Sequence, residues 1–487
     1  MIKFITLLIL WSSLLFSIGF NTLTSKPKSI EKDFYIYLYL KKHNLSKKDA
    51  KKLFKNVKHL NKKLKDEFAK YGIQKPKPKP TFQKPNFCYN MSEFIKQPPH
   101  KFLKLFSKLS SWHIQKYLNS PIPRSYMLRL AQDRGFNTFA KKVLSSPATN
   151  LRNSIIGIKS PYTKAEASFY LALFNLNDKI LATYYLQRAR ENAISQFKRD
   201  RATLWLYLIT KDKKYLKKLT YSPELNIYSL YAYENLQKTF NNLVTSFHSK
   251  KKKPPFDVDD PLSWAKIRAK TYKKIVHLTY KQKINYLTKM FKTKESEPHL
   301  AYFLKDINPN NYFLFYHDEY LKSYPKKRQA LILAIARQES EFIPTAISPS
   351  FALGLMQFMP FLVDHTAKKL GYENFKYEDI FKPKIAYEFA NDHLDFLENR
   401  LFNPLLVAYA YNGGIGYTRR NILQKNYFKL NSYEPFYSLE MITPREPMHY
   451  AKKVVANYVV YCNLLGVPIT VTELLERLKD IDSNHRY

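Results

Sequence analysis

The residues KKRQALILAIARQESEF, Lys326–Phe342, place an acid at the end of a strongly apolar run. The alanine, leucine and isoleucine residues from Ala330 to Ala336 favour a helix that is buried on nearly all sides. Pro344 cannot continue this helix, so we expect Glu339 in or just past its last turn. The unpaired carbonyl groups there oppose a negative charge and favour the protonated acid. A carboxylic acid kept neutral near pH 7 is what general acid catalysis requires.

Helix position by itself favours a plainer interpretation of Glu339, as a solvated end residue hydrogen-bonded to Ser340 or Arg337. The next stretch, SPSFALGLMQFMP, shifts the balance toward a site. It predicts a turn and then a new helix start, with Gln357 between two methionines. Glutamine can both donate to and accept from sugar hydroxyl and acetamide groups, and methionine offers a soft apolar wall. The methionine pair alone would fit a core equally well.

A third stretch, LLVAYAYNGGIGYTRR, places Tyr411 and Asn412 at a predicted helix end, directly before the Gly413–Gly414 turn. Tyr411 could orient Glu339 by a hydrogen bond, but a buried core tyrosine would give the same pattern. Each motif alone is therefore ambiguous.

Length and composition set the outer limits. The chain has 487 residues, 45% of them hydrophobic, which excludes global disorder and predicts two to four domains. A formal charge of +42 indicates an anionic partner such as nucleic acid, an anionic lipid surface or an acidic wall polymer. Because the lysines are spread along the whole chain, a generally basic solvated surface is an equally good explanation.

The order of segments predicts an exported, all-α protein. Residues 1–19 have the basic start, apolar run and small residues of a signal peptide, which indicates the periplasm. We expect a Lys- and Pro-rich helical segment and linker at 20–90, an α-superhelical domain at 91–248, a helical linker domain at 249–324 and a catalytic domain at 325–487. The linker includes the proline run at Lys75–Pro85. Only two cysteines, Cys88 and Cys462, are present, so the sequence allows one long-range disulfide but does not decide whether it forms.

The middle of the chain reads as helix after helix. KAEASFYLALFNL and DKILATYYLQRARENAI, joined by a short turn, predict a helical hairpin, and such hairpins bury their apolar faces by stacking into a curved solenoid. A further helix is expected from Ser222, with Ser222 as its N-cap and Pro223 at its first position.

RQES, GLMQ and AYNGG, in this order and spacing, resemble the catalytic domain of soluble lytic transglycosylases, lysozyme-like enzymes that cleave peptidoglycan. The resemblance covers roughly residues 328–467, and the upstream helical array resembles the U-shaped superhelical domain of that family. It implies that Glu339 is the only catalytic acid and base. Ser348, Gln357, Met359, Tyr411 and Asn412 would then line the sugar subsites or hold the acid in place.

The chain departs from the family pattern at two places. MITPREPMHYAKKVV has Glu446 and Tyr450 at the family spacing, but Pro447 stands where threonine is usual, which weakens Glu446 as a peptidoglycan contact. Phe351 stands where the family commonly has glycine, which puts the turn before Gly354 in question. Neither change affects the acid.

The resemblance implies a lyase that acts on peptidoglycan strands. The histidines lack a metal-binding spacing such as HExxH, so we expect no metal or other cofactor. The export signal argues against a nucleic-acid partner. Wall-synthesis or secretion complexes and peripheral membrane association are further partners that the charge and export signal leave open. One alternative is a goose-type muramidase, a hydrolase that uses a second acid such as Asp364 or Glu446. Another is a non-catalytic helical scaffold that binds the cell wall.

Overall fold

The computed structural model describes residues 18–73, 90–241, 243–247, 254–308, 311–425, 427–442 and 445–479, without the side chains of 445–448. These residues are overwhelmingly helical, which confirms the predicted all-α fold class. Two short strands, β1 (Leu243–Val244) and β2 (Asn311–Tyr312), pair in parallel. Most of the predicted signal segment, the Lys75–Pro85 linker and Cys88 lie outside the described residues.

The chain forms two compact units, each assembled from three separate segments. Unit 1 comprises Met1–Thr81, Ser246–Ile307 and Glu339–Ala390. Its helices are α2 (Phe20–Ser25), α3 (Ile30–Lys42), α4 (Lys47–Lys55), α5 (Lys62–Lys70), α17 (Pro261–Ile275), α18 (Tyr280–Met290), α19 (Glu297–Leu304) and α21 (Pro360–Lys369), with the 3₁₀ turns η1 (Lys294–Ser296) and η3 (Tyr377–Phe381). Two of the boundaries between the units fall inside helices, one in α20 (Lys326–Ser340) and one in α22 (Pro383–Glu398).

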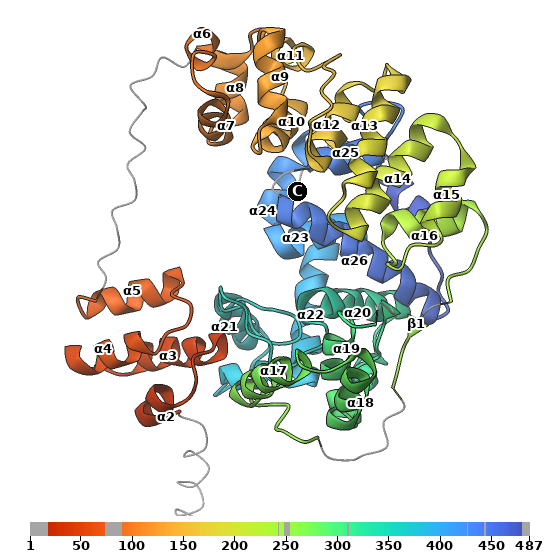
Figure 1. The fold of residues 1–487 in the computed structure, drawn as a ribbon. Helices are drawn as coiled ribbons and strands as arrows, with labels where there is room; N and C mark the ends of the chain where they lie inside the picture. The colour runs from red at the N-terminus through yellow and green to blue at the C-terminus, as the bar shows by residue number, and fades with distance from the viewer. Residues whose placement is uncertain are drawn as a thin grey trace, which may run out of the picture. The chain divides into compact units, whose positions relative to one another are not determined.

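Helices α2–α5, which we call the N-terminal helical cluster, pack together at the start of the described chain (Figure 1). Phe34, Leu53, Leu64 and Phe68 are fully buried. Helices α3, α4 and α5 each begin at a capping side chain that accepts a backbone N–H, which satisfies a donor that a helix start leaves open. This segment is therefore folded around a buried core, although its sequence is rich in lysine.

Unit 2 comprises Phe82–Thr245, Asn308–Gln338 and Asn391–Tyr487. Its first helices are α6 (Met91–Phe94), α7 (Pro99–Ser107), α8 (Ser111–Leu118), α9 (Arg124–Gln132), α10 (Phe136–Leu144), α11 (Thr149–Asn153), α12 (Ala165–Phe174), α13 (Lys179–Glu191), α14 (Gln196–Thr210), α15 (Lys213–Leu219) and α16 (Ile227–Asn235). From α12 to α16 each helix packs on the next one along the chain (Figure 1). The predicted hairpin of α12 and α13 is confirmed, and Asp178 caps the start of α13 by accepting from the Leu181 N–H at 2.9 Å.

The predicted start of the next helix at Ser222 is wrong. Helix α16 begins at Ile227, with Asn226 as its N-cap. The side chain of Asn226 accepts from the backbone of Ser229, and the Ser229 hydroxyl accepts in return from the Asn226 N–H at 3.0 Å. The carbonyl of Pro223 instead accepts from the Asn311 side chain. This reciprocal cap satisfies two backbone donors at once, so it sets the helix start.

The remaining helices of unit 2 are α23 (Pro404–Gly413), α24 (Ile415–Asn421), α25 (Phe436–Met441), α26 (Arg445–Leu464) and α27 (Val471–Glu476), with the 3₁₀ turns η2 (Asp318–Leu321) and η4 (Leu423–Lys425). Cys462 of α26 is a buried free thiol, and burial raises its pKa to about 11. Across the described ranges, every helix is too short or too polar to cross a membrane.

Candidate functional site

Helix α20 ends with the acid singled out by the sequence. Residues Ala330–Ala336 are almost completely buried, as the apolar run predicts. Glu339 is half-buried in the last turn, next to the final helical residue, Ser340. The chain then leaves the helix through Glu341 and Phe342, which both have left-handed backbone angles, φ 55° and 64°. The helix therefore ends before Pro344.

The neighbours of Glu339 on α20 have identifiable partners. The Ser340 hydroxyl donates to the carbonyl of Leu355 at 2.8 Å and so ties the helix end to the following loop. In unit 2, the Arg337 guanidinium donates to the carbonyl of Tyr312 at 2.7 Å and to the side chain of Asn457. Both contacts fix the last turn of α20 from the side chains that flank the acid.

The 341–359 loop is a compact structure with little main-chain freedom. Gly354 has φ 73°, and a Cβ there would lie 2.9 Å from the carbonyl oxygen of Ile380, closer than real Cβ contacts come. The Gly354 N–H donates to the Ala346 carbonyl at 2.8 Å, and Leu353 forms a short bridge with Phe358. Only glycine fits this position, because it needs both the left-handed angle and the missing side chain.

Gln357, a predicted substrate contact, forms hydrogen bonds within this loop. Its Nε2 donates to the carbonyls of Ala346 at 3.0 Å and Gly354 at 2.9 Å. Gln357 is half-buried and itself has a left-handed φ of 51°. Its amide nitrogen therefore holds the loop closed, a role that the sequence pattern did not indicate.

Ser348 and Met359 are the first and last residues of the 348–359 part of this loop. The Ser348 hydroxyl accepts from the Ala352 N–H at 2.9 Å, which closes a small turn. Met359 is half-buried directly before Pro360, the first residue of α21. Glu339, Ser348, Gln357 and Met359 thus belong to one segment of unit 1.

Tyr411 and Asn412 belong to unit 2, in the last turn of α23. The Tyr411 ring is half-buried and packs on His393 with ring centroids 5.4 Å apart, whereas Asn412 is exposed. The helix ends where Gly414, with φ 84°, donates to the carbonyl of Ala410 at 2.7 Å. Glu446 falls in the first turn of α26, but its side chain lies outside the described residues.

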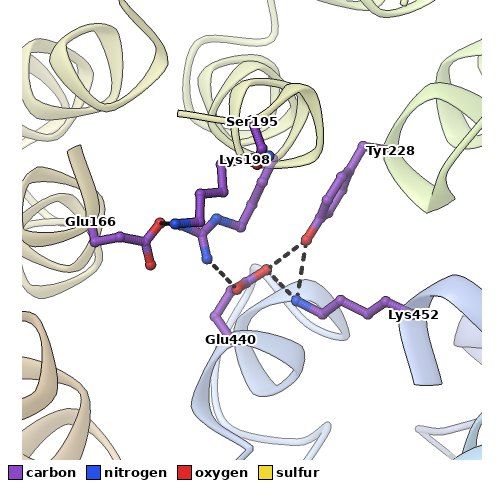
Figure 2. A network of polar contacts seen from close by, with 7 residues as sticks. Glu166, Ser195, Lys198, Tyr228, Glu440 and Lys452 are labelled. Atoms are coloured by element: carbon purple, nitrogen blue, oxygen red, sulfur yellow. Dashed lines mark hydrogen bonds and ion pairs between the residues drawn. The ribbon is translucent and has the colours of Figure 1, made fainter. Parts of the chain in front are cut away.

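Sequence reasoning missed a buried charged cluster in unit 2, which we call the Glu440 cluster (Figure 2). Lys452 of α26 donates to Glu440 Oε1 at 2.8 Å, and the Tyr228 hydroxyl donates to the same oxygen at 3.2 Å. Arg201 of α14 pairs with Glu166 at 2.7 Å and lies 3.6 Å from Glu440. Burial would raise the pKa of Glu440, but Lys452 and Arg201 outweigh it and lower that pKa below 4.5.

The Glu440 cluster joins helices from both ends of unit 2, from the solenoid-like part and from α25 and α26. Its members lie far apart in the sequence, from Glu166 to Lys452, so no local sequence motif indicates that they meet. In the described parts of the chain, no group of three or more His, Cys, Asp or Glu side chains could hold a metal ion.

Residues 319–433 match the family model of the transglycosylase SLT domain. The matched segment contains Glu339, Ser348, Gln357, Met359, Tyr411 and Asn412, whereas Glu446 lies beyond it. The soluble lytic murein transglycosylase of Salmonella typhimurium is 33% identical over 93 residues, or 19% of this chain and 14% of that protein. The putative soluble lytic murein transglycosylase of Haemophilus influenzae is 40% identical over 85 residues, or 17% of this chain and 14% of that protein.

A solved structure covers more of the chain but matches it loosely. The lytic transglycosylase Slt from Pseudomonas aeruginosa, solved as an inactive mutant, aligns with 93% of this chain and 79% of its own, at 18% identity and a TM-score of 0.47. The curated relatives are matched over only 14% of their length. The segment at 319–433, which contains Glu339, is therefore similar to the transglycosylase SLT domain.

Proposed function

We propose that the chain, with its SLT domain at residues 319–433, is a lytic transglycosylase of peptidoglycan that acts from the periplasm. The observation that carries the proposal is the half-buried Glu339 in the last turn of α20, followed by a loop that only Gly354 allows to close. The bond cut would be the β-1,4 link from N-acetylmuramic acid to N-acetylglucosamine.

Glu339 acts first as an acid in this proposal. The helix-end carbonyl groups around it oppose a negative charge, which favours the protonated carboxyl that can donate to the departing glycosidic oxygen. The acetamido group of the muramic acid assists at C1, in place of a carboxylate nucleophile. The matched motifs offer no second carboxylate, although both retaining and inverting hydrolysis normally use two.

In the second step Glu339, now ionised, takes the proton of the muramoyl 6-hydroxyl as that oxygen attacks C1. The product is a 1,6-anhydromuramic end, and water takes no part. Ser348, Met359, Tyr411, Asn412 and Glu446 would contact the glycan, while Gln357 keeps the loop in shape through its two carbonyl contacts. The excess positive charge of the chain would concentrate a substrate that carries lactyl and peptide carboxylates.

The experiment is mass spectrometry of fragments released from purified cell-wall sacculi by the protein and by its Glu339→Gln variant. We expect anhydromuramic ends, lighter than reducing ends by one water, from the unchanged protein. Glu339→Gln keeps the size of the side chain but cannot exchange a proton, so release should fall by roughly 100- to 10,000-fold with unchanged folding.

The matched control is Asp364→Asn, because Asp364 is the second acid that a muramidase could use. Asp364 is exposed on α21 and accepts from the Tyr377 hydroxyl at 2.8 Å. A transglycosylase should keep its activity in this variant. Reducing ends that disappear in Asp364→Asn would instead establish a hydrolase, and near-normal release by Glu339→Gln would contradict the proposed mechanism. Absence of any fragments would favour the wall-binding scaffold.

A further inference from the structure

The N-terminal helical cluster reaches the 341–359 loop through Asn61. The Oδ1 atom of Asn61 accepts from the Leu64 N–H at 2.9 Å and so caps the start of α5. The Nδ2 atom of the same side chain donates to the carbonyl of Pro349 at 2.9 Å. Both residues belong to unit 1. One amide group thus begins a helix of the cluster and holds a carbonyl of the distant loop.

Phe351 provides a second contact between the cluster and the loop. Its ring lies 5.6 Å from that of Phe34 and 5.5 Å from that of Tyr37, both on α3. Phe351 is almost fully buried and has φ 66°, a left-handed conformation that residues with a side chain rarely adopt. Such a conformation persists only where the surroundings enforce it. The two rings of α3 are part of those surroundings.

The contacts at Pro349 and Phe351 bracket the turn that carries Ser348. The Ser348 N–H donates to the carbonyl of Ala352 at 3.0 Å, and the Phe351 N–H donates to the carbonyl of Ser348 at 2.9 Å. The Ala352 N–H in turn donates to the Ser348 hydroxyl. A shift of Pro349 or Phe351 would therefore move Ser348 with it.

The cluster is also attached to other parts of unit 1. Glu31 of α3 pairs with Arg268 of α17 at 2.8 Å, and the Arg268 guanidinium lies over the Trp264 ring. The ring of Phe34 contacts Tyr377 at 6.0 Å. These attachments make the cluster a fixed support rather than a neighbour that touches the loop at one point.

We propose that the N-terminal helical cluster is a positioning element of the candidate site: Asn61, Phe34 and Tyr37 hold the turn at 348–352 and thereby set the orientation of Ser348. The effect on glycan binding rests on the function proposed above, in which Ser348 contacts the substrate. The effect on the loop itself rests on the contacts alone.

The test is Asn61→Asp in the full chain. Aspartate is an equally good N-cap for α5, but it has no donor for Pro349 and places a carboxylate against that carbonyl. We expect hydrogen exchange of the 346–358 backbone to become about tenfold faster. We also expect KM for soluble glycan strands to rise roughly fivefold, with kcat unchanged, since one hydrogen bond to a binding turn is lost.

Asn90→Asp is the matched control, because Asn90 caps α6 in unit 2 through the same kind of bond, from the Glu93 N–H at 2.9 Å. It should change neither quantity. Asn61→Ser, which keeps a cap without adding charge, should reproduce the effect of Asn61→Asp. Unchanged loop exchange and unchanged KM in both Asn61 variants would overturn the proposal. Faster loop exchange in a protein that releases no glycan fragments would support the link between cluster and loop and reject the enzymatic function.

Discussion

Two buried carboxylates, Asp33 in unit 1 and Glu440 in unit 2, are compensated in different ways. In unit 1, Asp33 at the start of α3 is completely buried and accepts from the backbone N–H groups of Lys58 at 2.9 Å and His59 at 2.7 Å. In unit 2, Glu440 is completely buried and faces two cations, Lys452 and Arg201. One carboxylate is thus compensated by main-chain groups, and the other by opposite charges.

The consequence is visible in the direction of the two pKa shifts. Burial raises the pKa of Asp33 above 3.8, and the two backbone hydrogen bonds only reduce that rise. The pKa of Glu440 is lowered below 4.5, because its cations more than offset burial. Backbone dipoles therefore fix a nearby loop at some electrostatic cost, whereas full charges can hold helices from distant parts of the chain together.

The strongest way to break this comparison is Glu440→Gln. The amide leaves Lys452 and Arg201 buried without their shared carboxylate, and an uncompensated buried charge typically destabilises by about 3–5 kcal/mol. Urea unfolding followed by circular dichroism should show this loss. In the double variant Glu440→Met with Lys452→Met the isolated charge is removed, so most of the stability should return. A double variant as unstable as the single one would contradict charge compensation as the source.

The stability of the protein should also depend on pH in the acidic range. The lowered pKa of Glu440 means that its contribution is fully present above pH 4.5 and is lost as the pH falls through the folded-state pKa. The raised pKa of Asp33 acts in the opposite sense, because its penalty is absent below pH 3.8 and grows as the pH rises. Each pKa unit corresponds to about 1.4 kcal/mol. Unfolding midpoints of the wild-type and Glu440→Gln proteins should therefore converge as the pH falls below 4.5. A difference that stays constant through acid would contradict a lowered pKa of Glu440 in the folded protein.

The smallest effect is expected for Asp33→Asn. An amide side chain removes the buried charge but presents an NH₂ group to one of the two backbone donors of Lys58 and His59. The lost hydrogen bond and the relieved burial partly cancel, so we expect a loss of about 1 kcal/mol in the free energy of unfolding. The loss should appear as faster hydrogen exchange at residues 57–60. A loss as large as that of Glu440→Gln would remove the distinction between the two regions.

The sequence predicts best where the signal is local. The apolar run of α20, the acid near its end and the glycine of the following turn are readable from spacing and residue type, and the structure places them as expected. The helix start predicted with Gln357 is wrong, because Gln357 has a left-handed φ of 51° and α21 begins only at Pro360. The helix start of α16 was misjudged because Asn226 forms a reciprocal cap with Ser229, which outcompetes the Ser222 and Pro223 pattern.

What a single sequence cannot supply is which distant side chains meet. Asn61 looks like an ordinary cap until its second hydrogen bond to Pro349 is seen. Glu440 and Lys452 look like solvated charges among many, yet both are completely buried and paired. Gln357 has a side chain suited to sugar recognition, but its Nε2 atom donates hydrogen bonds to two carbonyls of the loop. In each case the role depends on tertiary partners that neither propensity nor periodicity encodes.

The close approach of the Gly354 backbone to the carbonyl of Ile380 also has a genetic consequence. Every amino acid that a single-nucleotide change can introduce at a glycine codon carries a Cβ atom. Because that atom would meet the Ile380 oxygen at 2.9 Å on a backbone with φ 73°, all missense changes at this codon share one steric outcome. The position should therefore behave as an all-or-none site in a mutational survey, whatever the chemistry of the replacing side chain.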